Sequence, residues 1–339
     1  MSVKKICIVH LNQIGDLIFS LPLLKALREN HPDASIHSLV KPYLQELLVD
    51  SPFVDRVIPR KSGLAAKFKL LKNIRKNKYD LVISLARSEE CLMVTALSGA
   101  KIKAGFSYFP WDLCLNIKET IEGHNSWYNN AKLLKRLNVT VTKTDYVGLL
   151  NVNKTKPDPS LPEKFVIISS GTSKRRFTKT WQKEKFAQLM LLLKEKYGLS
   201  AVLVGGMDNQ EYNSEIIRIL KKKDREKDID FLDLTGKIGL ASLCSVIKEA
   251  SLFVGIDSGV MHIASCLDIP VVGLFGPTDP FYVGPQNKKS IVVREESMEC
   301  VPCYLKDCKH RDCMKNLGVS KVFEACKKLL IQHVSLNQV

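Results

Sequence analysis

The sequence predicts an α/β protein with two Rossmann-like domains whose parallel sheets face a cleft between them. Apolar, β-branched runs alternate with helical patterns through both halves of the chain, as is typical of parallel sheets covered by helices. Residues 151–164 hold three prolines and no apolar period, which indicates a linker. The length of 339 residues also exceeds what one hydrophobic core usually organises.

These observations divide the chain into three parts. We place the first domain at residues 1–155 and the second at 156–319, with a cysteine-rich stretch at 300–313. Residues 320–339 form a C-terminal helix that we expect to pack back toward the first domain.

The first domain opens with a buried strand at Lys4–Leu11 and a turn at Asn12–Asp16. A helical apolar pattern begins at Leu17, so Asp16 stands at the opening of a helix. Pro22 predicts a kink or a fresh helical start soon after. Further strands are expected at Ser35–Val40, Val54–Ile58 and Tyr79–Leu85.

A basic amphipathic helix is expected between Lys61 and Lys78, where lysine and arginine alternate with apolar residues. A solvated helix face is the simpler interpretation, and a contact with an acidic membrane surface is the alternative. The chain has 51 Lys+Arg against 35 Asp+Glu, a formal charge of +16. Such a charge favours an anionic partner, for which nucleic acid, acidic lipid and phosphorylated glycolipid all qualify.

The expected location is cytosolic. No secretory signal is visible near Lys4, and no apolar run approaches the ~20 residues that span a bilayer. Membrane contact would then be peripheral. The ten cysteines would be reduced thiols or metal ligands rather than a disulfide framework.

The second domain begins with a strand at Phe165–Ser169 that runs into Gly171 and Thr172. Thr180 is expected to cap the next helix, and Glu211 lies in the helix after a strand at Ala201–Gly205. The most informative stretch runs from Leu252 to Pro280 and reads as strand, tight turn, helix and strand.

Polar groups follow both strands of that stretch. Parallel strands present their carboxyl ends to one crevice, so the following residues would converge there: Asp257, Ser258, Gly259, His262, Thr278 and Asp279. Free N–H groups at the helix start suit a phosphate. Each residue also has a plain structural interpretation, as a helix cap, a turn glycine or a core histidine. Their combination favours a binding site.

With these residues in view, the sequence resembles the bacterial heptosyltransferases of glycosyltransferase family nine, which have the GT-B architecture. The resemblance rests on QIGDLIFSLP, SGAKIKAGF, GTSKRRFTKTW and GIDSGVMHIASCLDIPVVGLFGPTDP. It implies inverting transfer of heptose from ADP-heptose to an inner-core lipopolysaccharide acceptor, an anionic glycolipid. It also implies peripheral contact with the acidic inner membrane, no nucleic-acid partner and no cofactor for the chemistry.

The resemblance assigns roles to residues on both domains. Asp16 matches the family's general base, on what would be the acceptor-side domain, although a capping carboxylate is the alternative. Lys179 matches the lysine that stabilises the leaving ADP. The donor-binding matches are Gly171, Thr172, Asp257, Ser258, Gly259, His262 and, less directly, Glu211 on the ribose.

The acceptor side departs from the family pattern. Gly15 and Arg87 are candidate acceptor contacts, but Glu89 and Glu90 follow directly, which is unusual for an acidic substrate. The acceptor's identity therefore stays open. Another nucleotide-sugar transferase or epimerase of the same architecture, or a non-catalytic nucleotide-binding relative, are the alternative functions.

Four cysteines form a C-x2-C-x4-C-x4-C pattern at Cys300, Cys303, Cys308 and Cys313. Soft ligands at such spacing could hold a structural Zn²⁺ or iron, and packed or exposed thiols are the alternative. Relatives carry a similar stretch. Such a metal would be remote in sequence from Asp16 and the donor residues.

Overall fold

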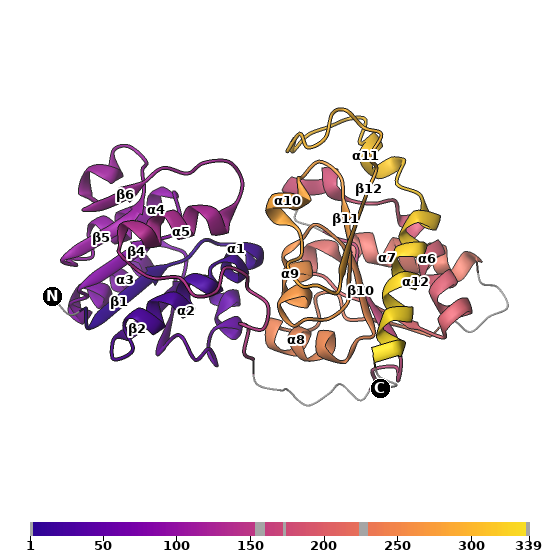
Figure 1. Ribbon diagram of the computed structural model, residues 1–339, viewed down its shortest axis with the longest axis horizontal. Helices are drawn as coiled ribbons and strands as arrows, with labels where there is room; N and C mark the ends of the chain where they lie inside the picture. Colours follow the sequence, from indigo (N-terminus) through magenta and orange to yellow (C-terminus); the bar gives the residue numbers. More distant parts are fainter. Residues whose placement is uncertain (1–2, 153–159, 172–173, 224–229, 337–339) are drawn as a thin grey trace. The chain divides into compact units, whose positions relative to one another are not determined.

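The computed structural model contains two compact units, Met1–Asn153 and Lys154–Val339 (Figure 1). It describes residues 3–152, 160–171, 174–223 and 230–336. The division lies within the linker expected at 151–164, most of whose prolines fall outside the described residues. Each unit contains one six-stranded parallel sheet.

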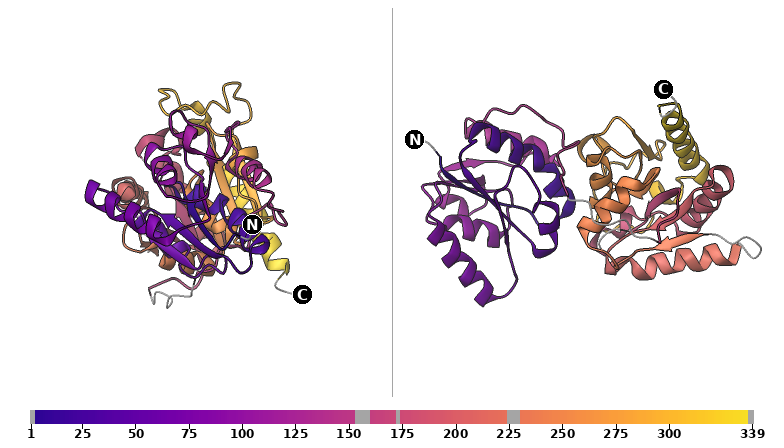
Figure 2. Two further views of the ribbon diagram at one scale, coloured as in Figure 1. Left: turned by 90° about the vertical axis from the view of Figure 1, so that its left-hand side faces the viewer. Right: turned by 90° about the horizontal axis from the view of Figure 1, so that it is seen from below.

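The first unit has the strand order β3-β2-β1-β4-β5-β6. Its strands are β1 (Lys5–Val9), β2 (Ser35–Val40), β3 (Arg56–Pro59), β4 (Leu81–Ser84), β5 (Ile102–Phe106) and β6 (Ile117–Glu119). Its helices are α1 (Ile14–Phe19), α2 (Leu21–Asn30), α3 (Leu64–Asn77), α4 (Glu89–Ala96) and α5 (Ser126–Arg136), with short 3₁₀ turns η1 (Pro42–Leu47) and η2 (Trp111–Cys114). Figure 2 shows helices on both faces of each sheet.

Local sequence accounts for several of these boundaries. The first helical segment ends at Phe19 and a new helix starts at Leu21 with Pro22 in its first turn, where proline's missing N–H has no consequence. This is the fresh start that Pro22 predicted. On α3, Leu70 and Ile74 are buried while the lysines face outward, as the amphipathic pattern required.

The second unit repeats the architecture with the order β12-β11-β10-β7-β8-β9. Its strands are β7 (Phe165–Ser169), β8 (Ser200–Leu203), β9 (Phe231–Asp233), β10 (Leu252–Ile256), β11 (Val271–Phe275) and β12 (Ser290–Arg294). Its helical segments are η3 (Lys174–Lys179), α6 (Lys183–Tyr197), η4 (Met207–Asn209), α7 (Gln210–Lys223), α8 (Leu240–Glu249), α9 (Gly259–Cys266), α10 (Pro280–Val283), α11 (Asp312–Lys315) and α12 (Val319–Leu336).

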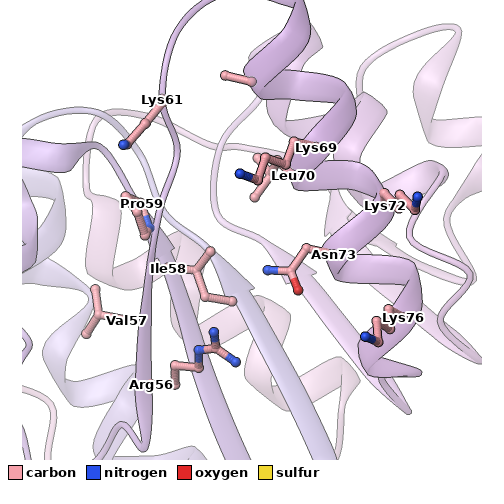
Figure 3. A pocket seen from close by; sticks show the side chains of 11 residues that line it. Arg56, Val57, Ile58, Pro59, Lys61, Lys69, Leu70, Lys72, Asn73 and Lys76 are labelled. Carbon is pink, nitrogen blue, oxygen red and sulfur yellow. The ribbon is translucent and has the colours of Figure 1, made fainter.

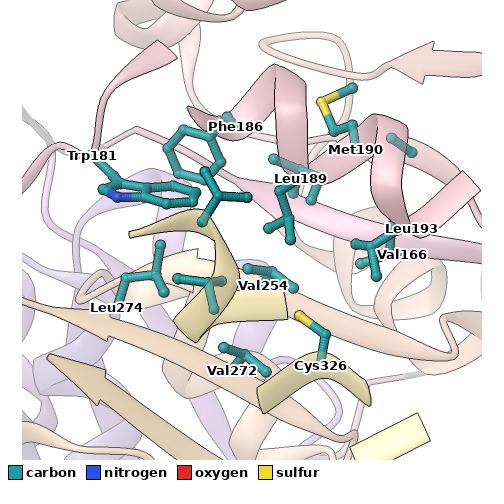
Figure 4. Packing of buried hydrophobic residues seen from close by; sticks show 14 of the residues in the cluster. Val166, Trp181, Phe186, Leu189, Met190, Leu193, Val254, Val272, Leu274 and Cys326 are labelled. Carbon is teal, nitrogen blue, oxygen red and sulfur yellow. The ribbon is translucent and has the colours of Figure 1, made fainter. Parts of the chain in front are cut away.

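The C-terminal helix belongs to the core of the second unit. Val322, Cys326 and Leu329 of α12 are buried in one cluster with Trp181 of that unit and residues of its sheet, and Figure 4 shows Cys326 beside Val272 and Val254. The expected packing of residues 320–339 back toward the first domain stays a prediction. An apolar helix face must be buried somewhere, and α12 buries its apolar face against Val254 of β10 and Val272 of β11.

Both sheets reverse their strand order at a defined place. In the first unit the chain moves outward from β1 to β3 and then returns to β4 beside β1, and the second unit does the same with β7 and β10. Ligands of such sheets bind beyond the carboxyl ends of the strands at this switch point. Among the residues the structure describes, none of the helices combines the length and apolar character needed to cross a bilayer.

Candidate functional site

The centre of the second unit's site is an ion pair between Lys179 and Asp257. Asp257 follows β10 directly, and Lys179 ends the 3₁₀ segment after β7, so the two meet at the switch point. The Lys179 Nζ lies 2.5 Å from the Asp257 Oδ2, and the side chains are only 14% and 7% exposed. Thr278, after β11, donates its hydroxyl to the same carboxylate oxygen at 2.6 Å. The segments that follow β7, β10 and β11 thus meet at the Asp257 carboxylate.

His262 lies beside this group on the first turns of α9 and is buried. Burial lowers its pKa to about 4, and the positive charge of Lys179 acts in the same direction while Asp257 opposes it. A neutral imidazole can donate one hydrogen bond and accept another. His262 is therefore equipped to orient a polar ligand rather than to supply charge.

The turn between β10 and α9 offers donors without partners. Ser258 precedes the first residue of α9, yet its hydroxyl caps no backbone N–H. Its Oγ is buried and has no hydrogen-bond partner within the described part of the chain. Gly259 begins α9, whose first N–H groups have no intrahelical acceptor. A buried donor hydroxyl next to a helix N-terminus is suited to an anion.

Gly171 has a steric reason to be glycine. A Cβ on Gly171 would lie 2.3 Å from the Asn209 side chain, which closes the loop after β8. Behind them, the Asn213 amide donates to Thr235 Oγ1 at 2.6 Å, and Ser170 donates to Asn213. This buried hydrogen-bonded chain ties the ends of β7 and β9 to α7, and nothing in the sequence singled it out.

Other donor-side predictions have mixed outcomes. Thr172 lies outside the described residues. Glu211 is exposed in the first turn of α7, on the connection that leaves β8. Thr180 does not cap α6, because Gln182 holds the cap position; its hydroxyl donates to the Phe177 carbonyl instead.

In the first unit, Asp16 lies beyond the carboxyl end of β1, at the switch point of that sheet. It is the third residue of α1 and is half-buried, with Gln13 in the cap position. Ser126, the first residue of α5, donates its hydroxyl to Asp16 Oδ1 at 3.4 Å. The pKa of Tyr43 is raised by burial and by the charge of Asp16. The Asp16 carboxylate thus accepts a hydrogen bond from Ser126 and lies near enough to Tyr43 for its charge to act on that phenol.

A buried arginine supports the loop that carries Asp16. Arg60 is fully buried, and its guanidinium pairs with Glu90 Oε2 at 2.8 Å. The same guanidinium contacts the side chain of Asn12 and, at 3.5 Å, the carbonyl of His10. His10 is itself buried between Ser20 and Ser38 hydroxyls, at 3.1 Å each. Burial and then Arg60 lower the pKa of His10 to about 3.

This arrangement explains Glu90. Its carboxylate neutralises Arg60, with Lys41 and Lys67 at 3.9 and 4.0 Å, so it is not an acidic group turned toward an acidic substrate. Gly15 lies within α1 beside Asp16, and Arg87 is exposed before α4. The sequence missed Arg60, because an Arg-Lys pair after a strand resembles ordinary solvated surface.

The four cysteines of the predicted metal site lie close to one another. The pKa of Cys313 is raised by burial first, and the neighbouring thiols of Cys300, Cys303 and Cys308 add to this shift. Across the described ranges, no three His, Cys, Asp or Glu side chains are arranged to hold a metal ion. A structural Zn²⁺ or iron stays a prediction, which metal analysis of the purified protein would decide.

A family model described as glycosyltransferase family 9 (heptosyltransferase) matches residues 67–314, most of the chain. The chain belongs to this family. Lipooligosaccharide heptosyltransferase 2 of Campylobacter jejuni is 27% identical to this family 9 chain over 340 residues, covering 95% of this chain and 97% of the relative.

Solved structures show the same fold. Escherichia coli ADP-heptose lps heptosyltransferase II superimposes with a TM-score of 0.80 at 22% identity, covering 97% of this family 9 chain and 99% of the other. The E. coli heptosyltransferase WaaC with ADP gives a TM-score of 0.71 at 19% identity, covering 96% and 99%. This heptosyltransferase-family protein therefore has the GT-B fold that the sequence predicted.

Proposed function

We propose that this family 9 glycosyltransferase transfers heptose from ADP-heptose to an anionic inner-core lipopolysaccharide acceptor, with inversion at the transferred carbon. The observation that carries the proposal is the buried Lys179–Asp257 pair at a switch point, beside the unpartnered Ser258 hydroxyl. A lysine and free N–H groups suit a diphosphate. The donor is proposed from the relatives, one of which is described as bound to ADP.

The donor-side residues divide between diphosphate and sugar. Lys179 would exchange part of its contact with Asp257 for the diphosphate, together with the Ser258 hydroxyl and the N–H groups at Gly259. Asp257 and neutral His262 would then accept hydrogen bonds from the sugar hydroxyls. Gly171 and Thr172 would line the phosphate side, and Glu211 the ribose.

Asp16 is proposed as the general base. A single displacement with inversion needs a base that removes the proton of the acceptor hydroxyl as its oxygen attacks the anomeric carbon. The bond from that carbon to the phosphate oxygen breaks, and ADP leaves with the bonding electrons. The first turn of a helix favours an ionised carboxylate, and Asp16 occupies such a position. Gly15 and Arg87 are the proposed acceptor contacts.

We propose that the chemistry needs no metal ion. The negative charge that develops on the leaving diphosphate would be balanced by Lys179 and by donors such as the Ser258 hydroxyl, which the fold already holds in place. These groups are placed before substrate arrives, so little reorganisation is needed during the reaction. The four cysteines take no part in this step.

We also propose peripheral contact with the acidic cytoplasmic face of the inner membrane, where a glycolipid acceptor would be presented. A cavity of about 570 Å³ lies between β3 and α3, and Figure 3 shows its basic side chains along both walls. Its cations are Arg56, Lys61, Lys69, Lys72 and Lys76. None of the five makes an ion pair with any described residue, and apolar Ile58 and Leu70 line the space between them. Cations over an apolar floor suit lipid phosphates.

The direct experiment supplies ADP-heptose and a truncated core acceptor and detects the product by mass spectrometry, with EDTA in a parallel reaction. Formation of a heptosylated acceptor with and without EDTA supports the proposal. Competition by ADP but not UDP separates this function from that of a transferase or epimerase that uses another nucleotide sugar. No product with any core acceptor, despite ADP binding, would favour a non-catalytic relative.

A further inference from the structure

The cysteine-rich stretch 300–313 contacts two segments of the donor site. One segment ends in Lys179, and the other carries Thr278, whose hydroxyl donates to Asp257. On one side, the N–H groups of Cys303 and Tyr304 both donate to the carbonyl of Pro277, at 3.0 and 2.8 Å. Pro277 immediately precedes Thr278, whose hydroxyl holds the Asp257 carboxylate. The stretch is therefore hydrogen-bonded to the connection after β11, which carries Thr278.

On the other side, the same stretch holds the segment that ends in Lys179. The Thr178 hydroxyl donates to the carbonyl of Leu305 at 3.0 Å. The guanidinium of Arg311 donates to the Phe177 carbonyl at 3.4 Å and to the Thr180 hydroxyl at 3.1 Å. It also lies over the Phe177 ring, 5.5 Å from its centroid. These contacts flank Lys179 on both sides in sequence.

The backbone of the stretch is unusual at two of the residues that make these contacts. Tyr304 and Arg311 both have positive φ, 55° and 53°, a conformation that costs non-glycine residues energy unless the surroundings enforce it. They are the residues that contact Pro277 and the Phe177–Thr180 segment. The thiol of Cys308 accepts a hydrogen bond from the Arg311 N–H at 3.4 Å, which steadies the turn that presents the guanidinium.

Gly276 allows this close approach. A Cβ at Gly276 would lie 2.5 Å from the sulfur of Met314 and 3.1 Å from that of Cys313. The connection after β11 therefore needs glycine because the end of the cysteine-rich stretch packs against it.

We propose that the cysteine-rich stretch positions the donor site, and that Arg311 is its main positioning residue. By holding Phe177 and Thr180 while the same stretch holds Pro277, it sets the separation at which Lys179 and Asp257 meet. Arg311 acts through Lys179 rather than on the substrate. The inference rests on the proposed role of Lys179 in binding the diphosphate.

A double-mutant cycle on ADP binding tests this. Arg311→Ala should weaken ADP binding about tenfold in the wild-type background. In the Lys179→Ala background the loss should be less than about twofold, because the lysine through which Arg311 acts is already absent. Lys309→Ala, an exposed cation of the same stretch, is the matched control and should leave ADP affinity unchanged. Arg311→Lys should recover part of the loss, since one contact of the fork can be kept.

Thr178→Val provides an independent variant if Arg311→Ala folds poorly. It removes the donor to Leu305 without touching Arg311 and should show the same dependence on Lys179. Equal losses in both backgrounds, or no loss in either variant, would overturn the positioning role. If Lys179→Ala itself leaves ADP affinity intact, the proposed donor site fails instead, so the two failures are distinguishable.

Discussion

Lys179 and Asp257 form an ion pair, with 2.5 Å between Nζ and Oδ2, across 78 residues of sequence. Each charge neutralises the other at a mostly buried position, where an unpaired charge would be costly. The pair therefore holds the Lys179 ammonium at the carboxyl end of β10.

Replacing Lys179 should weaken ADP binding and slow transfer together. Lys179→Ala removes a charge that serves the diphosphate in both the ground state and the transition state. The measurements are calorimetric titration with ADP and steady-state kcat and KM. Lys183→Ala, four residues later and paired with Glu215 at a more exposed position, is the matched control. Loss of kcat with unchanged ADP affinity would contradict a shared role.

Acid should destabilise the second unit through His262. Its pKa in the folded protein is about 4, below the usual 6.5, so the unfolded chain binds the proton more readily. The free energy of unfolding is therefore unaffected by His262 protonation above pH 6.5. It should decrease by on the order of 3 kcal/mol as the pH falls from 6.5 toward 4. Urea unfolding at pH 7.5 and pH 5 measures it. His262→Gln should flatten the dependence, whereas exposed His310→Gln should not.

Glu90→Gln should destabilise the first unit by about 3 kcal/mol, because it leaves the buried Arg60 guanidinium without its counter-charge. Arg60 also contacts Asn12 in the Asp16 loop, so kcat should fall as well. Chemical unfolding and steady-state kinetics give the two readouts. Glu122→Gln, at an exposed position, removes one partner of Lys132 and should cost far less. Equal costs would rule out a special role for Arg60.

Reversing Lys69, Lys72 and Lys76 to Glu should release the protein from acidic liposomes, since each surface cation contributes about 1 kcal/mol to such attraction. Turnover on a soluble, delipidated acceptor should be almost unchanged. Reversal of three cations from other surfaces of the same unit, Lys118, Lys135 and Arg136, matches the change in net charge. If both triple variants lose binding equally, only the overall charge matters and the cavity is not the contact.

Elements with strong local patterns could be predicted from the sequence. The stretch from Leu252 to Pro280 folds as expected into β10, α9 and β11, because each apolar run ends in turn residues that stop it. Asp257 and Thr278 then meet because parallel strands end at one edge. Pro22 marked a helix start for an equally local reason.

Relationships that depend on distant packing could not be predicted. Arg60 is buried only because Glu90, thirty residues later, neutralises it, and neither residue signals the other in sequence. Arg311 meets Phe177 across 134 residues. The C-terminal helix had an apolar face that either unit could have accepted, and the second unit buries it.

The most direct test of the account is the effect of Asp16→Asn on chemistry and on donor binding. Asparagine keeps the size of the side chain and can still accept a hydrogen bond from Ser126, but it cannot take a proton from the acceptor. If Asp16 is the general base, kcat should fall by ~10² or more while ADP affinity stays nearly unchanged, the usual effect of losing such a base. A near-wild-type kcat would contradict the account and remove Asp16 from the mechanism.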